Sequence, residues 1–276
     1  MATSRLILLN MPIGDLADMS TRVLEGLKVG KHFAVEDTRT FRETLSRLGI
    51  AGDKHILSMH DHSSEAKWGR LLEIVENGED LYVCSEAGSP ILSDPAFPLV
   101  RLAQEKGLAV ETYSGISAVV TALELSGLPP IPFSFQAFLP RADGRIRQAL
   151  HSLRAGTHIF FESPNRLKNT IEICAELYPT CEVVVVKEIT KQFQRVIRFK
   201  AQEAASALQD LVEKGEFVWL LHIPQGMSAG TISPEVIAYA EEILSEGVRN
   251  KTLSHLLAEI LSRPSKEIYT ELSRKR

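Results

Sequence analysis

The chain has 276 residues, enough for one large domain or two of ordinary size. Its composition, 44% hydrophobic and 24% charged, is typical of a globular protein with a sizeable core and excludes extensive disorder. The net charge of −4 excludes a protein that is basic throughout, such as a DNA-coating protein, although a local basic strip can exist within that total.

The first part of the chain alternates short β-rich runs with amphipathic stretches. This alternation predicts a mostly parallel sheet covered by helices on both faces. Ligands of such sheets bind where strands end, so the loops after the strands are the candidate site. The strands are predicted at 5–9, 32–35, 54–58, 80–85 and 109–113, and the helices at 21–27, 38–48, 64–77 and 95–106.

A helix predicted at 117–126 leads to Gly127–Pro132, whose three prolines in six residues make it the best candidate for a domain boundary. A second α/β set follows, and two adjacent strands in it indicate a mixed sheet. Its strands are predicted at 133–138, 157–161, 182–187, 194–199 and 217–222, and its helices at 145–153, 165–177 and 202–214. A linker is predicted at 225–231, then three short helices starting near Ser233, Thr252 and Pro264.

Several common kinds of site are disfavoured. Cys84, Cys174 and Cys181 are odd in number and lack metal-ligand spacing, so we expect no disulfide framework, and a reducing cytoplasm fits. His60 and His62 lack further ligands, so no metal is expected. No Gly-x-Gly-x-x-Gly follows a strand, which disfavours a dinucleotide. No apolar run is long enough to cross a membrane or to form a signal peptide.

Five predicted loops after strands concentrate glycine, proline and charged residues. Such residues permit tight turns and close approach of the backbone to a ligand. Ordinary βα loops also need turn residues, but five such loops on one side of the alternating elements favour a site. The loops are Asn10–Asp15, Glu36–Arg39, Ser85–Pro90, Ser114–Ser117 and Glu162–Arg166.

Taken in order, four of these loops and two further segments resemble the motifs of one family. The motifs are Asn10–Leu16, Glu36–Arg39, Ser85–Pro95, Phe135–Arg141, Glu162–Arg166 and Lys187–Lys191. They resemble those of the ribosomal RNA small subunit methyltransferase I family, within the tetrapyrrole-methylase-like group of S-adenosylmethionine-dependent methyltransferases. The resemblance covers nearly the whole chain, and residues 253–272 are similar to the family's small helical C-terminal domain.

The resemblance implies an α/β fold: two α/β domains of the tetrapyrrole methylase type (class III methyltransferase) with a small helical C-terminal domain. Together with the predicted elements it gives domains at 1–115, 116–226 and 232–276. It also implies S-adenosylmethionine as cofactor and 2′-O-methylation of a cytidine ribose in the decoding region of 16S rRNA. The partners implied are the small ribosomal subunit and a second copy of the chain in a cytoplasmic homodimer.

Most of the implied cofactor contacts precede the segment Gly127–Pro132, and two, Leu139 and Glu162, follow it. S-adenosylmethionine has no phosphate, which is consistent with the missing glycine-rich phosphate loop. Ser117 and Ala118 lie at a predicted helix start, where free N–H groups suit polar cofactor atoms, although Ser117 can equally be a simple helix cap. The contacts carried over by motif are Pro12, Ala87, Gly88, Ser89, Leu92, Ser117, Ala118, Leu139 and Glu162.

A ribose hydroxyl is a weak nucleophile at neutral pH, so a base or cation near it would help. Glu36, Asp37, Lys187 and Glu188 are the candidate catalytic residues, of which Lys187 would first have to lose its proton. The acidic pair has a structural alternative, which is to pair with Arg39 or to cap the following helix.

An RNA-modifying enzyme also needs cations for phosphates. Residues 141–154 carry four arginines against one Asp, and residues 249–276 carry seven Lys or Arg against three Glu. Charge runs are also typical of solvated helix faces. The candidate RNA-binding residues are Arg39, Arg141, Arg145, Arg147 and Arg166.

Two other functions stay open. A methyltransferase of the same fold can act on a small molecule such as a tetrapyrrole, but the basic tail and Phe138–Arg141 speak against it. A catalytically silent RNA-binding module is the second, because Glu86 and Ser89 stand where the family usually has Asp and Thr.

Overall fold

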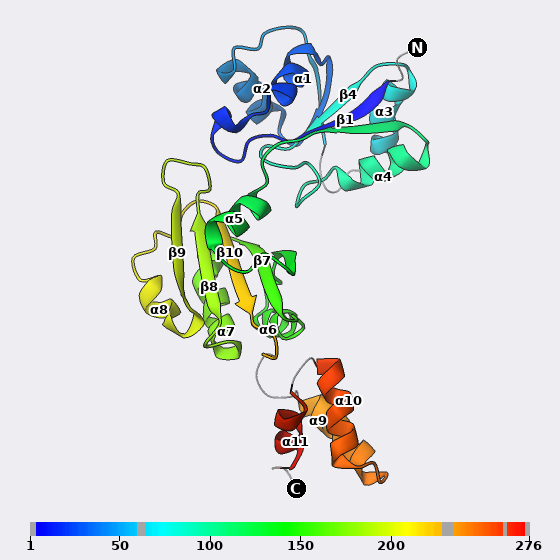
Figure 1. Ribbon diagram of the computed structural model, residues 1–276. Coiled ribbons are helices and arrows are strands. Elements are labelled where there is room, and N and C mark those ends of the chain that lie inside the picture. The colour runs from blue at the N-terminus through cyan, green and yellow to red at the C-terminus, as the bar shows by residue number, and fades with distance from the viewer. Residues whose placement is uncertain (1–3, 60–64, 228–233, 262–263, 274–276) are drawn as a thin grey trace. The chain divides into compact units, whose positions relative to one another are not determined.

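The computed structural model describes residues 4–59, 65–227, 234–261 and 264–273 (Figure 1). Its contacts divide the chain into two compact units. Unit 1 contains the residues up to Thr121 together with Ile189–Gln192. Unit 2 contains Ala122–Glu188 and the residues from Phe193 onward. The segment Gly127–Pro132 lies within unit 2, where the Thr157 hydroxyl and N–H donate to Pro129 O and Pro132 O (2.6 and 3.0 Å).

Unit 1 is built on a five-stranded sheet in which every pair of neighbours is parallel, in the order β3-β2-β4-β1-β5. Such strands lie between two layers of helices, and all four residues of β4 are buried accordingly. The predicted parallel sheet is confirmed. The strands are β1 (Arg5–Leu9), β2 (His32–Val35), β3 (His55–Ser58), β4 (Leu81–Cys84) and β5 (Ala109–Tyr113).

Helices cover both faces of this sheet, as predicted: α1 (Thr21–Val29) and α2 (Thr38–Arg47) lie on one face, α3 (Glu65–Glu76) and α4 (Phe97–Glu105) on the other (Figure 1). Successive residues of β1 therefore enter different cores. Ile7 and Leu9 pack with α1 and α2, whereas Leu6 and Leu8 pack with α3 and α4. A short 3₁₀ helix, η1 (Leu16–Asp18), precedes α1.

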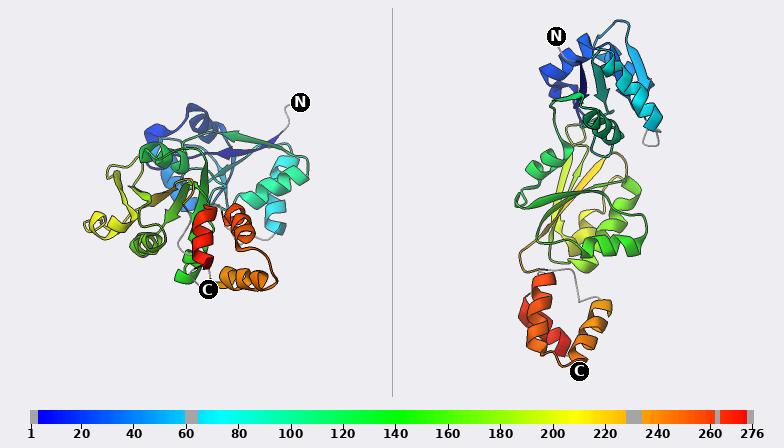
Figure 2. Two further views of the ribbon diagram at one scale, coloured as in Figure 1. Left: turned by 60° about the horizontal axis from the view of Figure 1, so that its bottom comes forward. Right: turned by 90° about the vertical axis from the view of Figure 1, so that its right-hand side faces the viewer.

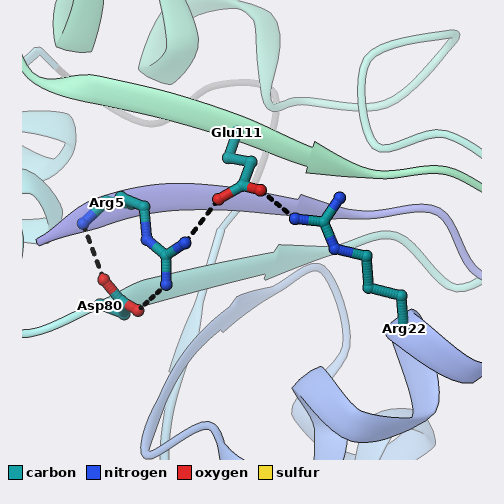
Figure 3. Close-up of polar contacts among 4 residues, drawn as sticks. All are labelled: Arg5, Arg22, Asp80 and Glu111. Carbon is teal, nitrogen blue, oxygen red and sulfur yellow. Dashed lines mark hydrogen bonds and ion pairs between the residues drawn. The ribbon is translucent and has the colours of Figure 1, made fainter.

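Ion pairs connect three neighbouring strands of this sheet to α1 (Figure 3). The Arg5 guanidinium, at the start of β1, donates to Asp80 beside β4 (2.9 Å) and to Glu111 of β5 (2.6 Å). Glu111 also pairs with Arg22 of α1. The hydrogen bond to Asp80 is the main reason why the pKa of Arg5 lies above its ordinary value. The network is partly exposed, since 28–37% of the Arg5, Asp80 and Glu111 side chains remains accessible.

Unit 2 contains a five-stranded mixed sheet in the order β6-β7-β10-β8-β9, with only β6 and β7 parallel. The prediction of a mixed sheet is confirmed. The register of β6 and β7 shifts between Phe135 and Phe138, where Ala137 has a φ of 54°. The strands are β6 (Phe133–Phe138), β7 (Gly156–Glu162), β8 (Glu182–Lys187), β9 (Arg195–Lys200) and β10 (Phe217–Ile223).

One face of this sheet packs against α6 (Asp143–His151), α7 (Pro164–Leu177) and α8 (Ala204–Ala207), which follows the 3₁₀ helix η2 (Ala201–Glu203). Phe160 and Trp219 stack at the centre of this core, with ring centroids 4.2 Å apart. The end of α5 (Ala118–Ser126) is held by Arg198 of β9, whose guanidinium donates to Ser126 O (2.8 Å) and to Leu125 O.

The helix predicted at 202–214 is wrong over most of its length, because regular helix ends at Ala207. Leu208 and Leu211 are still buried, but the backbone that carries them forms a series of turns instead of a helix. Lys187 of β8 donates its Nζ proton to Val212 O (2.9 Å), and Lys214 N–H donates to the same oxygen (2.8 Å). Both contacts replace the bonds that a continuing helix would make.

Three short helices follow, as predicted: α9 (Pro234–Ser245), α10 (Asn250–Leu261) and α11 (Ser265–Ser273). They pack against one another around a small core that includes Leu244, Leu253 and Ile268 (Figures 1 and 2). Most of the linker predicted at 225–231 lies outside the described residues, and so do His60 and His62.

Candidate functional site

Two of the predicted loops of unit 1 are joined by backbone hydrogen bonds at the ends of β1 and β4. Met11 N–H donates to Gly88 O and Gly88 N–H donates to Met11 O, both at 2.9 Å. Gly88 has a φ of 66°, in the left-handed region that favours glycine, and a Cβ there would lie 3.3 Å from Ile13. The buried Ser85 hydroxyl donates to Ala87 O (3.0 Å), which fixes the turn before Gly88.

The loop after β5 meets the first of these loops. A Cβ at Gly115 would lie 2.5 Å from Asn10 O, so only glycine fits without movement. The Asn10 side chain donates to the Thr112 hydroxyl (3.0 Å) and Tyr113 O (3.2 Å), and Ser20 donates to Ser114 O (2.9 Å). Three strand-exit loops are thus packed together at the carboxyl edge of the sheet, as the sequence predicts.

The segment Ile189–Gln192 belongs to unit 1 although it lies between β8 and β9 in the sequence. A Cβ at Gly14 would lie 2.6 Å from the Thr190 hydroxyl and 2.9 Å from Ile189 O. Asp15 N–H donates to that hydroxyl at 3.2 Å. Neither Thr190 nor Asn10 is among the residues predicted for the site, although both lie inside quoted motifs. The neighbouring glycines, Gly14 and Gly115, are the signal in the sequence that marks these close approaches.

The loops after β1, β4 and β5, together with the start of α5, contain seven of the nine implied cofactor contacts. Pro12 and Gly88 are buried in the joined loops, whereas Ala87 and Leu92 are exposed, Leu92 by 43%. Ser117 and Ala118 are partly exposed at the start of α5. Ser117 O accepts the N–H of Thr121 (2.9 Å), so Ser117 is at the position where helix N–H groups lack helical partners. These features fit a cofactor that combines a purine with an amino acid. Glycine lets the backbone approach the ligand, the accessible Leu92 side chain offers apolar surface, and the start of α5 offers free N–H groups.

Glu36 and Asp37 lie beside these loops in unit 1. Asp37 Oδ1 accepts the N–H groups of Arg39 (2.7 Å) and Thr40 (3.1 Å), so Asp37 caps α2. Both acidic residues line a cavity of about 10 Å³ together with Ser85. This cavity is too small for a cofactor. An open hollow of about 610 Å³ at the end of α2 contains none of the predicted site residues.

Lys187 and Glu188 are engaged within unit 2. Lys187 donates to Val212 O and lies 5.6 Å from the centre of the Phe217 ring. Glu188 has a φ of 51°, and its Oε1 accepts the N–H of Glu216 at 2.8 Å. The four candidate catalytic residues are thus divided between the two units.

Leu139, Glu162 and Arg166 form one cluster in unit 2. The Leu139 side chain is buried in the core. The Glu162 carboxylate accepts from Ser163 N–H (2.8 Å) and the Thr170 hydroxyl (3.1 Å), and lies 3.4 Å from the Arg166 guanidinium. Arg166 also donates to Leu139 O (3.0 Å) and Pro140 O (2.7 Å). These side chains hold the segment after β6 in place.

The predicted RNA-binding arginines differ in their surroundings. Arg39, Arg141 and Arg145 are exposed, and the structure gives none of them an ion pair with an acidic side chain of the described residues. Arg147 instead pairs with Glu176 of α7. Of the three candidate arginines at 141–147, two are therefore exposed cations and one links two helices.

All three cysteines are free and buried, as expected from their spacing. Burial raises the pKa of Cys181 to about 11 and holds the pKa values of Cys84 and Cys174 above the ordinary range, so all three thiols stay protonated. Among the described residues no group of three or more His, Cys, Asp or Glu is placed to hold a metal ion. In the same part of the chain, every helix is too short or too polar to span a bilayer.

Relatives with the same name match nearly the whole chain. It is 33% identical to the "Ribosomal RNA small subunit methyltransferase I" of Halalkalibacterium halodurans over 272 residues, 96% of this chain and 93% of that protein. The protein of that name from Bacillus subtilis is 30% identical over 274 residues, 96% of this chain and 92% of its own.

Solved structures share the fold. A uroporphyrin-III-C-methyltransferase from Thermus thermophilus matches with a TM-score of 0.57 at 16% identity, covering 79% of this chain and 94% of that one. A diphthine synthase matches with a TM-score of 0.60 at 15% identity, covering 81% and 90%. The model of the tetrapyrrole (corrin/porphyrin) methylases matches residues 5–205, most of both α/β sets. The chain therefore belongs to the tetrapyrrole methylase family of methyltransferases.

Proposed function

We propose that this protein transfers a methyl group from S-adenosylmethionine to the 2′-hydroxyl of a cytidine ribose in the decoding region of 16S rRNA. The observation that carries the proposal is the full-length similarity to relatives named for the small ribosomal subunit. The packed loops of unit 1 support it, because they fit the cofactor. We further propose that the protein acts as a homodimer in the cytoplasm, where the small subunit is assembled.

The residues proposed to hold the cofactor are Pro12, Gly88, Leu92, Ser117 and Ala118, together with Ala87 and Ser89. Leu92 would cover an apolar surface, and the start of α5 would bind polar atoms. When bound, the cofactor supplies a methyl group on a positively charged sulfur. Methyl transfer breaks the carbon–sulfur bond, forms a carbon–oxygen bond and releases the hydroxyl proton, which a nearby base can accept.

We propose Glu36 as the proton acceptor. Its side chain is exposed and lines a cavity with Met11 and Ser85 of the joined loops. Asp37 caps α2 with its carboxylate, and Lys187 and Glu188 belong to unit 2. Replacing Glu36 with Gln should lower kcat by about 100-fold or more, because general bases contribute that much, and leave cofactor affinity unchanged. Asp37→Asn is the comparison, since it changes the neighbouring carboxylate. A Glu36→Gln enzyme with the wild-type kcat would reject this assignment.

Labelled-methyl transfer tests the reaction itself. The substrates are small subunits from cells that lack this protein, naked 16S rRNA and a panel of porphyrinoids, with the label mapped after digestion. We expect label on a cytidine 2′-oxygen. Label on a base nitrogen or on a porphyrinoid would contradict the proposed substrate. Calorimetric titration tests the cofactor separately, because absence of binding at millimolar S-adenosylmethionine would favour an RNA-binding module without catalysis.

A further inference from the structure

Phe138, the last residue of β6, packs against a neighbouring aromatic ring but is left half exposed. The residue is 52% exposed, and its ring makes an edge contact with Phe161, with centroids 5.8 Å apart. Phe135 contacts the same Phe161 ring at 4.8 Å. The φ of 54° at Ala137 and the register shift of β6 set the direction in which Phe138 leaves the strand.

The segment after Phe138 is fixed by buried groups. Arg166 binds the carbonyl oxygens of Leu139 and Pro140, and the Glu162 carboxylate, whose side chain is fully buried, lies beside Arg166. Leu139 also anchors its side chain in the core of unit 2. A single exposed Phe is ordinary on a protein surface. At Phe138, however, the chain is fixed both before and after the residue, so the side chain is preorganised for a contact.

The positive charge that follows Phe138 in the sequence indicates the chemistry of the contact. Arg141 and Arg145 follow within seven residues, both exposed and both without an acidic partner among the described side chains. Proteins that bind single-stranded nucleic acid combine cations for the phosphates with aromatic rings on which bases stack. A protein partner would contact this surface through acidic and apolar side chains. Binding that depends on a nucleobase therefore distinguishes RNA from a protein partner.

We propose that Phe138 is a stacking platform for a base in an unpaired stretch of the substrate RNA, with Arg141 and Arg145 binding the flanking phosphates. The inference rests on the proposed function, since it assigns how that RNA is held. Phe138 is a positioning residue in this scheme and does not take part in the transfer of the methyl group.

The test uses the natural tryptophans. Trp68 and Trp219 are the two in the chain, exposed by 4% and 0%, so Phe138→Trp adds an accessible one whose fluorescence should be quenched by a stacked base. Phe133→Trp is the matched control, because Phe133 starts the same strand and is 47% exposed. An oligocytidylate should quench the first variant and not the second. An abasic oligomer of equal charge should quench neither.

Affinity and kinetics give the second readout. Phe138→Leu keeps an apolar side chain but removes the aromatic face, and should weaken oligocytidylate binding about tenfold. Phe138→Trp should retain it. With small subunits the Leu variant should raise KM and leave S-adenosylmethionine affinity unchanged. Arg141→Gln and Arg145→Gln should each lower the salt slope of binding by about one.

Quenching of both tryptophan variants alike, or wild-type RNA affinity in Phe138→Leu, would overturn the platform even if the wild type methylates small subunits. Quenching confined to Phe138→Trp would uphold the platform even if no methyl transfer to rRNA were found, and that second result would reject the proposed function alone.

Discussion

The two units differ in how many polar side chains they bury. Among the described residues seven polar or charged side chains are buried, and only Ser85 belongs to unit 1, whereas Ser126, Thr157, His158, Glu162, Thr170 and Ser254 belong to unit 2. In unit 1 the Arg5, Asp80, Glu111 and Arg22 ion pairs are partly exposed, and apolar side chains fill the space between the sheet and the helices on each face. Apolar layers follow from hydrophobic pattern alone, whereas buried polar groups are stable only with specific partners.

The largest effect should come from removing the buried carboxylate of unit 2. Glu162→Ala should lower the free energy of unfolding by about 3 kcal/mol, because Arg166 and the Thr170 hydroxyl lose their shared partner. Urea unfolding followed by Trp219 fluorescence in a Trp68→Phe background reports on unit 2. Glu182→Ala, whose carboxylate is 54% exposed, is the control and should change stability by less than about 0.5 kcal/mol.

In unit 1 the corresponding sensitive position is a glycine. Gly115→Ala places a Cβ 2.5 Å from Asn10 O and should cost about 2 kcal/mol, detected by Trp68 fluorescence in a Trp219→Phe background. Gly69→Ala on α3 is the control, because its Cβ meets no atom within 4 Å, and should stabilise by up to about 1 kcal/mol. Equal stabilities of the two variants would show that the loops after β1 and β5 yield easily.

A smaller effect is expected at the ion pairs in Figure 3. Glu111→Ala removes a carboxylate shared by Arg5 and Arg22 and should cost about 1 kcal/mol, less in high salt, because the side chains are partly exposed. Glu105→Ala removes an isolated pair with Arg101 and should have almost no effect. A loss at Glu111 as large as that at Glu162 would contradict the contrast between the units.

The smallest expected effect is the loss of stability of unit 2 at acidic pH. Burial lowers the pKa of His158, whose Nε2 lies 2.7 Å from Arg154 O and whose Nδ1 lies 2.8 Å from the Ser134 hydroxyl. The unfolded chain therefore binds a proton at this histidine more readily than the folded protein does. The contribution of His158 to stability is complete above the ordinary histidine pKa and is lost as pH falls through the lower pKa of the folded protein. Stability of unit 2, followed by Trp219, should fall between pH 8 and about pH 5. His158→Gln should reduce that fall, and an unchanged pH profile would count against it.

The same contrast explains what the sequence could predict. The strands β1 to β5 and the helices α1 to α4 follow from alternating apolar runs, and their predicted positions are confirmed to within a few residues. The 3₁₀ helix η1 is not predicted. In unit 2 the helix predicted at 202–214 is wrong because Leu208 and Leu211 are buried without helical backbone. The spacing of apolar residues predicts which side chains are buried but not the backbone conformation. The turns are seen only in the structure, where Lys187 and Lys214 donate to Val212 O.

The candidate site was predictable as a set of loops but less so residue by residue. The positions of Gly88, Ser117 and Glu36 at strand ends follow from the alternation of elements. The cap on α2 is among the alternatives predicted for Glu36 and Asp37, and the structure assigns it to Asp37. The bonds of Arg166 to Leu139 O and Pro140 O do not follow from the sequence. These bonds depend on which backbone groups are left without partners, and this is decided only when the chain folds.

The segment Ile189–Gln192 has a consequence for how the protein can be divided. The chain passes from one unit to the other three times, between Thr121 and Ala122 and on either side of this segment, so unit 1 is not a continuous stretch of sequence. A fragment ending at Thr121 would contain all five parallel strands, yet it would lack the Thr190 hydroxyl that receives Asp15 N–H. Neither a protease nor a gene rearrangement can free a complete unit 1 with a single cut.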